Sequence, residues 1–223
     1  RVVWDVEAAE KGGYEHFMLK EIMEQPRALK ATLEPRVKNG EIVLENFELS
    51  DEELEDIDKI VITACGSASY AGQVGRYVIE KLCRIPTQVE VASELRYREP
   101  IVDHHTLLIA VSQSGETADT IAAIKECKAR GARTMAIVNV VGSTIANLVD
   151  HVLYTWAGPE VAVATTKGYT TQVAMLDLLA IYLAKRLGRI EDERYNQLLA
   201  GLQEMPSKIQ RAIDLNGHVQ YLA

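Results

Sequence analysis

The sequence has 223 residues, of which 48% are hydrophobic, and a formal net charge of −8 at pH 7. This length and composition suffice for one sizeable buried core, and no window approaches the roughly 18 consecutive apolar residues that suggest a membrane helix. The acidic balance argues against nucleic acid as a partner, because binding a phosphate backbone requires clustered Lys and Arg. We therefore expect a soluble protein that binds neither nucleic acid nor membrane.

The cysteines and the N-terminus predict the compartment. The three cysteines are odd in number and lack the C-x-x-C spacing of zinc and redox sites. Free thiols are typical of cytosolic proteins, and the first residues, R-V-V-W-D, lack the basic and apolar regions of a signal peptide. We expect a cytoplasmic protein without a metal or other cofactor. Because the chain does not begin with Met, we also expect it to be an excised domain.

The first 58 residues predict a helical arm followed by a connector. Residues 6–35 carry apolar side chains at helical spacing, interrupted at Pro26 and closed by Pro35. The following stretch contains the turn Asn39-Gly40, which is typical of a short hairpin, and then runs as an acidic connector to Asp58.

From residue 59 onward, β-branched runs alternate with amphipathic helical stretches. The predicted strands are 60–64, 87–91, 107–111, 134–139 and 151–155. The predicted helices are 69–83, 92–98, 117–130, 143–149 and 166–187, with one more at 191–215. Continuous apolar runs indicate strands buried on both faces, hence a parallel sheet between helices. The predicted fold class is α/β, a doubly wound five-stranded parallel sheet of flavodoxin-like order 2-1-3-4-5. The predicted organisation is an arm and connector over 1–58, the α/β domain over 59–190, and a helix and linker over 191–223.

Two hydroxyl-rich loops would meet at one point of such a sheet. In this strand order a ligand binds beyond the carboxyl ends of the first and third strands. The loops there are C-G-S-A-S at 65–69 and S-Q-S-G-E-T at 112–117. The helix that follows the second loop presents free amides, to which the hydroxyls of Ser112, Ser114 and Thr117 could be added. These groups could hold a phosphate without Lys or Arg.

Structural interpretations of the same residues stay open. Ser114 could be only an N-cap, Glu116 only a first-turn acid and Gly115 only a turn residue. The matching loop at 65–69 favours a binding site, since two such loops at one crevice need a common cause. Cys65 is expected to be structural because no histidine lies nearby in the sequence, and the adjacent histidines 104 and 105 read as part of a solvated loop.

A third polar segment, A-G-P-E-V-A-V-A-T-T-K-G-Y-T-T-Q at 157–172, follows the fifth predicted strand. It places Glu160, Thr165, Thr166 and Lys167 at the same carboxyl edge. For Lys167 the alternative is an exposed lysine in the first turn of the long helix.

Four stretches identify a family when they are taken together and in this order. They are A-C-G-S-A-S-Y-A-G, E-V-A-S-E-L-R-Y-R, S-Q-S-G-E-T-A-D-T and A-G-P-E-V-A-V-A-T-T-K. They closely resemble the first sugar isomerase (SIS) domain of the glucosamine-6-phosphate synthases. The resemblance extends to the N-terminal W-D-V-E-A-A-E-K-G-G-Y-E-H-F-M-L-K-E-I and so covers nearly the whole chain.

The resemblance implies a bound fructose-6-phosphate or glucosamine-6-phosphate. In the family the phosphate is held by the residues that match Ser112, Gln113, Ser114 and Thr117. The sugar is approached by the matches of Val163 and Thr165, with Glu160 in the same stretch. At the first loop the family more often has C-G-T-S. Ser67 keeps a hydroxyl there, whereas Ala68 removes one, which Ser69 or a water would have to replace.

The resemblance also implies partners. The family enzyme has a glutaminase domain and two SIS domains. Its glutamate for proton transfer between sugar carbons, its histidine for ring opening and its C-terminal lysine come from the second SIS domain or the C-terminal tail. We therefore expect no catalytic residue in this chain, a homodimer in the family's manner, and missing glutaminase and second SIS domains. The alternative is a non-catalytic SIS module of a regulator, although no basic helix-turn-helix pattern accompanies it. A flavin- or dinucleotide-binding domain on a similar sheet is disfavoured because no G-x-G-x-x-G follows the first predicted strand.

Overall fold

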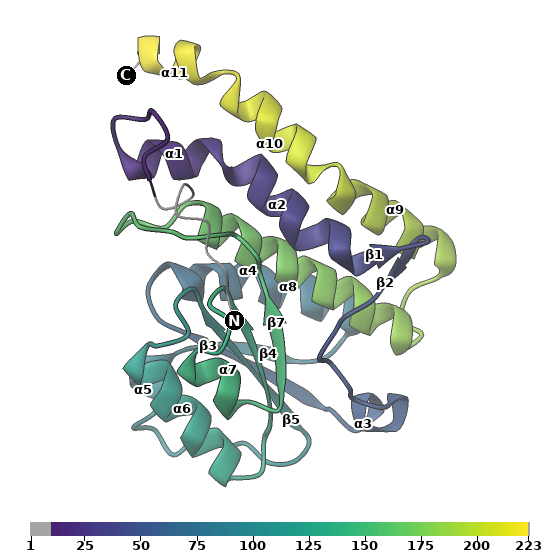
Figure 1. Ribbon diagram of the computed structural model, residues 1–223. Helices are drawn as coiled ribbons and strands as arrows, with labels where there is room; N and C mark the ends of the chain where they lie inside the picture. The colour runs from purple at the N-terminus through teal and green to yellow at the C-terminus, as the bar shows by residue number, and fades with distance from the viewer. Residues whose placement is uncertain (1–9, 223) are drawn as a thin grey trace.

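A five-stranded parallel sheet forms the centre of the protein (Figure 1). The computed structural model describes residues 10–222. The strands are β3 (Lys59–Ala64), β4 (Thr87–Val91), β5 (Thr106–Ser112), β6 (Arg133–Val138) and β7 (His151–Tyr154). Their order is β4-β3-β5-β6-β7, all neighbours being parallel. In chain order this is 2-1-3-4-5, so the predicted fold class and strand order are confirmed.

Helices cover both faces of the sheet, which explains why the central strands β3, β5 and β6 are buried along almost their whole length. The helices α4 (Ser67–Cys83) and α8 (Lys167–Arg186) cover one face, and α5 (Ala92–Leu95), α6 (Ala118–Ala129) and α7 (Thr144–Leu148) cover the other. Along β5, Leu107 and Ile109 contribute to the core on one face, whereas Leu108 and Ala110 contribute to the core on the other. Each side chain is fully buried, whichever way it points.

The N-terminal arm adds a further layer above α8. It consists of α1 (Phe17–Met23), α2 (Gln25–Leu33) and the short 3₁₀ helix η2 (Glu34–Arg36). The predicted arm starts at residues that lie outside the described part, and within that part the helix begins only at Phe17. Gly12 and Gly13 have positive φ angles of 58° and 87°, which break the helical pattern before it. As expected, Pro26 marks an interruption, because it lies in the first turn of a new helix.

The connector contains the predicted hairpin and a helix that was not predicted. Strands β1 (Val37–Lys38) and β2 (Glu41–Ile42) are antiparallel around Asn39 and Gly40, both at positive φ. The acidic stretch then forms α3 (Asp51–Glu55), where sequence analysis expected only a connector. Its start is a capping box, in which the Ser50 hydroxyl accepts from the Glu53 amide at 3.1 Å and the Glu53 carboxylate accepts from the Ser50 amide at 2.9 Å.

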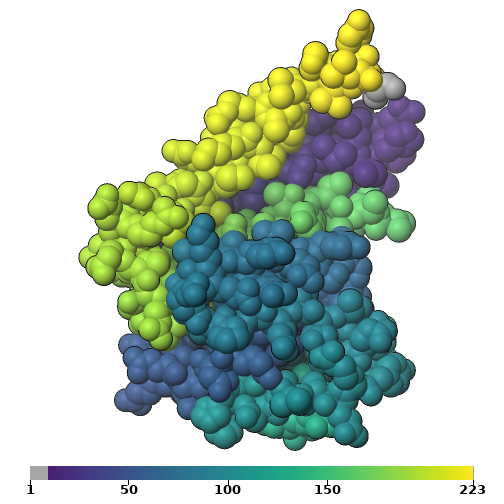
Figure 2. Space-filling view, turned by 180° about the vertical axis from the view of Figure 1, so that it is seen from behind, coloured from purple at the N-terminus to yellow at the C-terminus, as the bar shows by residue number. Residues whose placement is uncertain are grey.

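The C-terminal region is divided more than predicted. Instead of one helix over 191–215, the chain forms α9 (Asp192–Gln203), α10 (Met205–Ile213) and α11 (Asn216–Leu222). The break before α10 follows from Pro206, which lacks an amide hydrogen and is tolerated only in a first turn. Figure 2 shows these helices beside the arm, above the layers that contain the sheet. Between residues 10 and 222, no helix is both long and apolar enough to cross a bilayer.

An ion pair joins the arm to α8. The Lys167 ammonium is only 2% exposed and lies 2.6 Å from a carboxylate oxygen of Glu24, at the junction of α1 and α2. The same carboxylate lies 2.9 Å from Arg27 and 3.8 Å from Lys20. Glu24 therefore compensates a buried positive charge that α8 could not otherwise accommodate.

Replacing Glu24 with Ala should strongly destabilise the protein. The substitution would leave Lys167 buried without its counter-ion, for which about 3–5 kcal/mol is typical. Urea denaturation would measure the loss. Glu34→Ala is a matched control, since Glu34 forms an exposed arm ion pair with Lys30 at 3.4 Å and should contribute little. Equal effects of the two substitutions would contradict this account.

An apolar groove between α4, α8 and α9 contains one carboxyl group. The groove measures about 330 Å³ and is lined mainly by aliphatic side chains around Asp177. The Asp177 Oδ1 atom is buried and has no hydrogen-bond partner among the described residues. Burial raises the pKa of this carboxyl from 3.8 to about 6.

Asp177 should make stability fall as the pH rises. Its pKa is higher in the native state than in the unfolded chain, so the native state binds the proton more tightly between about pH 4 and pH 6. The free energy of unfolding should therefore drop through this window, by about 3 kcal/mol at most. Asp177→Asn should be more stable than the parent at pH 7.5 and similar to it at pH 4, as measured by urea denaturation. Parallel pH profiles of the two proteins would exclude this role for Asp177.

Candidate functional site

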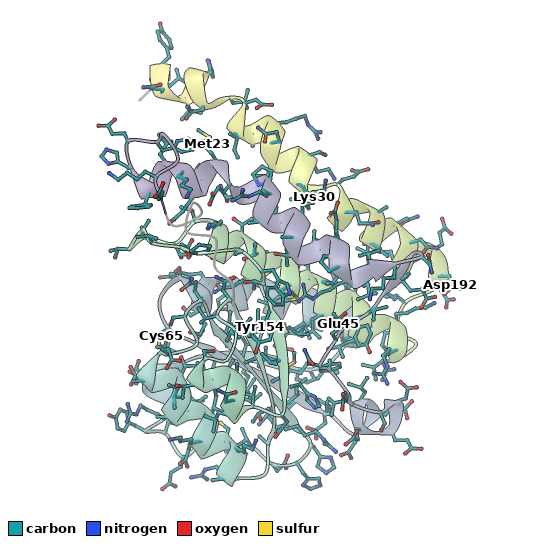
Figure 3. All side chains as sticks on the ribbon, viewed as in Figure 1. Met23, Lys30, Glu45, Cys65, Tyr154 and Asp192 are labelled. Carbon is teal, nitrogen blue, oxygen red and sulfur yellow. The ribbon has the colours of Figure 1, made fainter. Side chains whose placement is uncertain are left out.

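A polar cavity of about 210 Å³ opens at the carboxyl ends of β3 and β5. Ala64 pairs with Val111 at the ends of these strands, which brings the loops after them to the same level. All eight residues singled out from the sequence line the cavity: Ser67, Ser112, Gln113, Ser114, Thr117, Glu160, Val163 and Thr165. The remaining lining residues are Cys65, Ala68, Val111, Ala162 and Gln172. Figure 3 marks the position of Cys65, directly after β3.

The loop after β5 is held by its own hydroxyls. The Ser112 hydroxyl accepts from the Gly115 amide at 3.1 Å and lies 3.2 Å from the Thr117 hydroxyl. The Ser114 hydroxyl accepts from the Glu116 amide at 3.2 Å. Ser114 is therefore not the N-cap of α6, since Thr117 occupies that position without a side-chain capping bond. The first amides of α6 remain outside the helical ladder, as at any helix start.

Gly115 is required by close packing as well as by its backbone angle. Its φ is +67°, and a Cβ atom built there would lie 2.6 Å from the Cβ of Ser143 and closer still to the Ser143 hydroxyl. The loop after β5 therefore packs against the start of α7 with no room for a side chain. The Gly115 carbonyl accepts from the Ile145 amide at 3.0 Å, which fixes the same contact.

Glu116 also belongs to this contact rather than to the helix that follows it. Its carboxylate accepts from the Thr144 amide and the Thr144 hydroxyl, both at 2.7 Å, at the first residue of α7. These bonds hold the pKa of the Glu116 carboxyl below its usual value. The interpretation of Glu116 as a first-turn acid of its own helix is corrected, because it caps the neighbouring helix instead.

The loop after β3 reaches α4 through a glycine. Gly66 has φ 59° and ψ −138°, a combination open almost only to glycine, and Ser67 is the first residue of α4. Ala68 lines the cavity and offers it only a methyl group. The Ser69 hydroxyl donates to the Gly66 carbonyl at 2.6 Å, and Ser69 is not among the lining residues. The structure therefore gives no support to Ser69 as a replacement for the absent hydroxyl at position 68.

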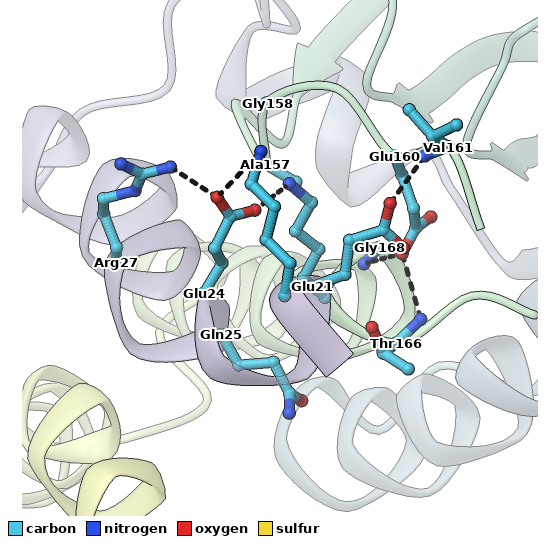
Figure 4. Close-up of polar contacts among 12 residues, drawn as sticks. Glu21, Glu24, Gln25, Arg27, Ala157, Gly158, Glu160, Val161, Thr166 and Gly168 are labelled. Atoms are coloured by element: carbon cyan, nitrogen blue, oxygen red, sulfur yellow. Dashed lines mark hydrogen bonds and ion pairs between the residues drawn. The ribbon is translucent and has the colours of Figure 1, made fainter. Parts of the chain in front are cut away.

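Glu160 organises the segment between β7 and α8 (Figure 4). Its carboxylate accepts from the Thr165 hydroxyl at 2.8 Å, the Thr166 amide at 2.9 Å and the Gly168 amide at 3.0 Å. It thus caps the start of α8 and draws Thr165 toward the cavity. A Cβ atom at Gly168 would lie 2.7 Å from the Thr165 hydroxyl, so only glycine permits this arrangement.

Two residues with open alternatives fall outside the cavity. Lys167 is in the first turn of α8, but it is buried against Glu24 and does not line the cavity, so its interpretation as an exposed lysine is wrong. His105 lies at the opposite end of β5, half-exposed, and its ring is 2.9 Å from a carboxylate oxygen of Asp56. A hydrogen bond to the Asp56 carbonyl raises the pKa of His105.

Two residues that shape the site were not predicted from the sequence. Gln172 lines the cavity, is 3% exposed, and has an Oε1 atom without a hydrogen-bond partner in the described chain. Glu21, on α1, accepts from the Val161 and Ala162 amides at 2.6 and 3.1 Å. Gln172 lies one helical turn after Gly168, and this spacing in the sequence could have indicated that Gln172 reaches the cavity. No local sequence pattern could have predicted the role of Glu21, because its hydrogen-bond partners are about 140 positions away.

The chemistry of the cavity suits an anion. Its lining residues include no Lys or Arg, and the one carboxylate among them, Glu160, is occupied by three donors. What remains are serine and threonine hydroxyls, the side-chain amides of Gln113 and Gln172, and the free backbone amides at the starts of α4 and α6. Hydrogen bonds to a charged group contribute about 1.5–3 kcal/mol each, more than the helix dipole does. Several such bonds suffice to hold a phosphate.

The chain belongs to the SIS domain family, whose model matches residues 53–182. It is 55% identical over its full length to the glutamine–fructose-6-phosphate aminotransferase (isomerizing) of Caldanaerobacter subterraneus subsp. tengcongensis and 53% identical to that of Symbiobacterium thermophilum. In both cases the chain spans 37% of the relative's length. The resemblance to the SIS domains of this enzyme family is thereby confirmed.

Solved structures agree with this assignment. The C-terminal domain of glucosamine-fructose-6-phosphate aminotransferase from Francisella tularensis has a TM-score of 0.90 and 36% identity, over 96% of this chain and 60% of that one. The glucosamine-6-phosphate deaminase from Thermotoga maritima has a TM-score of 0.59 and 24% identity, over 83% of this chain and 53% of that one. The latter similarity concerns the fold alone.

Gly115→Ala should destabilise the protein through a steric conflict that a second substitution relieves. The single change should lower the free energy of unfolding by about 1–3 kcal/mol through overpacking, in addition to strain at positive φ. Gly142→Ala is the matched control, because Gly142 has φ +73° and open space around its Cβ position. Urea denaturation should show that Ser143→Gly restores part of the stability of Gly115→Ala. Additive effects in this double-mutant cycle would disprove the contact.

Proposed function

We propose that this chain is the first SIS domain of an enzyme that makes glucosamine-6-phosphate from fructose-6-phosphate and glutamine, and that its cavity binds fructose-6-phosphate. The observation that carries the proposal is the hydroxyl-lined cavity at the ends of β3 and β5. The names of the relatives at 50–55% identity support the choice of enzyme. The choice of the first of the two SIS domains rests on the four stretches quoted from the sequence.

The loop after β5 is proposed to hold the phosphate, through Ser112, Gln113, Ser114 and Thr117. Ser67 would add a hydroxyl from the start of α4. The Ser114 hydroxyl accepts from a loop amide and keeps its own proton for donation to a phosphate oxygen. Ser112 and Thr117 share one hydrogen bond, so one of their two hydroxyl protons is left to donate. A phosphate here would also meet the free amides of α6.

The sugar is proposed to lie toward the segment between β7 and α8. Val163 and Thr165 line that side of the cavity. The Thr165 hydroxyl donates to Glu160 and keeps its lone pairs available for a sugar hydroxyl. Glu160 itself serves as a cap of α8, so its proposed role is to position Thr165 rather than to act in catalysis.

The rest of the reaction would need other parts of the enzyme. The chain spans 37% of the curated relatives that it matches, which is consistent with a separate glutaminase domain and a second SIS domain. The proton-transfer groups would come from that second domain, so we propose that the isolated chain binds the sugar phosphate without converting it.

Three further expectations from the sequence stay predictions: a cytoplasmic location, the domain division at residues 58 and 190, and self-association as a dimer. One candidate surface for a dimer is a stripe of exposed side chains on α4, formed by Tyr70, Val74 and Tyr77.

Calorimetric titration of the chain with fructose-6-phosphate tests the proposal. We expect binding at millimolar concentration or below, which corresponds to about 4 kcal/mol or more. Ser67→Ala and Ser114→Ala should each weaken binding about tenfold, because each removes a hydrogen bond to a charged group. Ser69→Ala should change affinity little, since that hydroxyl bonds to the Gly66 carbonyl.

Two outcomes of the titration would contradict the proposal. No heat at several millimolar fructose-6-phosphate would overturn the proposed ligand. Unchanged affinity in both Ser67→Ala and Ser114→Ala would mean that the phosphate binds outside this cavity. Ala68→Ser, which restores the hydroxyl common in the family, should tighten binding if the phosphate lies between the two loops.

A further inference from the structure

The segment that forms the sugar side of the cavity is not held by burial of its own side chains. Residues 159–166 form neither helix nor strand. Val161 is half-exposed and Val163 is fully exposed, although both are aliphatic. Apolar contacts therefore contribute little to the shape of the segment, and its polar contacts must determine where Ala162, Val163 and Thr165 lie along the cavity.

A carboxylate from the N-terminal arm supplies the contacts at the middle of this segment. In Figure 4, Glu21 on α1 points toward Val161 from one side, while Glu160 faces Thr166 and Gly168 on the other. One oxygen of Glu21 accepts from two successive backbone amides, at 2.6 Å from Val161 and 3.1 Å from Ala162. Charge-assisted bonds of this kind are shorter and about twice as strong as neutral ones.

The buried position of Glu21 lowers the stability of the fold, so stability does not explain why a carboxylate lies there. The residue is 2% exposed, and its second oxygen, Oε2, is buried without a hydrogen-bond partner within the described residues. Removing a carboxylate from water is unfavourable unless its oxygens are satisfied. Half-satisfied buried charges are rare and are found where geometry serves function. This pattern distinguishes Glu21 from Glu24 nearby, whose carboxylate is paired with cations.

We infer that Glu21 is a positioning residue for the sugar side of the cavity. It fixes the backbone of Val161 and Ala162, and this holds Val163 and Thr165 along the cavity wall. The phosphate side does not depend on it, because the loop after β5 is closed by its own hydroxyls. The consequence for the ligand rests on the proposed function, whereas the anchoring of the segment does not.

The inference makes the arm part of the binding site. Helix α1 is separated from Val161 and Ala162 by about 140 positions in the sequence and contributes no lining residue itself. It acts through backbone amides, so it would control how tightly the sugar is held without touching the sugar. The expected signature is a loss of discrimination between a sugar phosphate and inorganic phosphate.

Amide hydrogen exchange tests the anchoring directly. In the 223-residue chain, Glu21→Ala should speed exchange at Val161 and Ala162 by at least about tenfold, while amides in the strands stay protected. Glu21→Gln keeps an oxygen acceptor but not the charge, and should give an intermediate effect. Glu15→Ala, directly before α1, is the matched control, because the Glu15 side chain is 84% exposed. Unchanged exchange at both amides in Glu21→Ala would overturn the inference, whatever the ligand does.

Titrations of the same variants test the effect on the ligand. Glu21→Ala should bind fructose-6-phosphate about tenfold more weakly, or about 1.4 kcal/mol, while its affinity for inorganic phosphate should change less than about twofold. Glu21→Gln should recover part of the affinity, and thermal denaturation should show that both variants are folded. Equal losses for the two ligands would indicate general loosening and contradict a positioning role. If the parent chain binds no fructose-6-phosphate, the proposed function fails, and the exchange data still decide whether Glu21 anchors the segment.

Discussion

Where the chain leaves β7, three carboxylates replace the sheet as the groups that hold the backbone in place. The Thr155 amide still donates to the Val138 carbonyl of β6, but residues 159–166 form neither helix nor strand and must run along the cavity before α8 begins. Glu160 accepts from the amides at the start of α8, and Glu21 accepts from the amides in the middle of the segment. Glu24 compensates the buried Lys167 between them. Without these three acids the segment would have unpaired amides and an unpaired buried charge.

The two sides of the cavity have different physical origins. The loops after β3 and β5 are short and follow rigid strands. A hydroxyl that donates to a backbone carbonyl closes the first loop, and hydroxyls that accept from backbone amides close the second, all within a few residues. The side formed by residues 159–166 depends on groups from α1, from the segment itself and from α8. We therefore interpret the first side as a preformed anion site and the second as the part whose shape responds to the surrounding structure. A preformed phosphate site needs little reorganisation on binding, which favours affinity.

The arm shares its core with the sheet layer instead of being an appendage. Leu29 and Leu33 of α2 lie in the same buried cluster as Ile62 of β3 and Leu199 of α9. Polar contacts extend this attachment along the arm, since the Thr170 hydroxyl donates to the Gln25 amide oxygen at 2.5 Å and Arg36 donates to the Tyr154 carbonyl at 2.5 Å. The SIS family model matches residues 53–182, so this layer of the site lies outside the part that the wider family shares.

The sequence was sufficient for the elements whose signals are local. Five β-branched runs predicted the sheet, and the runs of the central strands β3, β5 and β6 are nearly continuously apolar because these strands are buried on both faces. The strand order then brought the loops at 65–69 and 112–117 to one edge, so the eight site residues could be placed at one cavity. The N-G turn predicted its hairpin for the same reason, since Asn and Gly tolerate positive φ.

Only the tertiary structure decided which partner each charged residue has. Glu116 caps α7 instead of α6, Lys167 is buried against Glu24, and Glu21 supports a segment about 140 positions away. A carboxylate or an ammonium has no periodic or local signature that names its partner, because its contacts depend on which helices pack together. The sequence by itself determined the fold and the residues of the candidate site. Packing of the arm against α8 decided how those residues are held, because that contact joins groups that no local pattern connects.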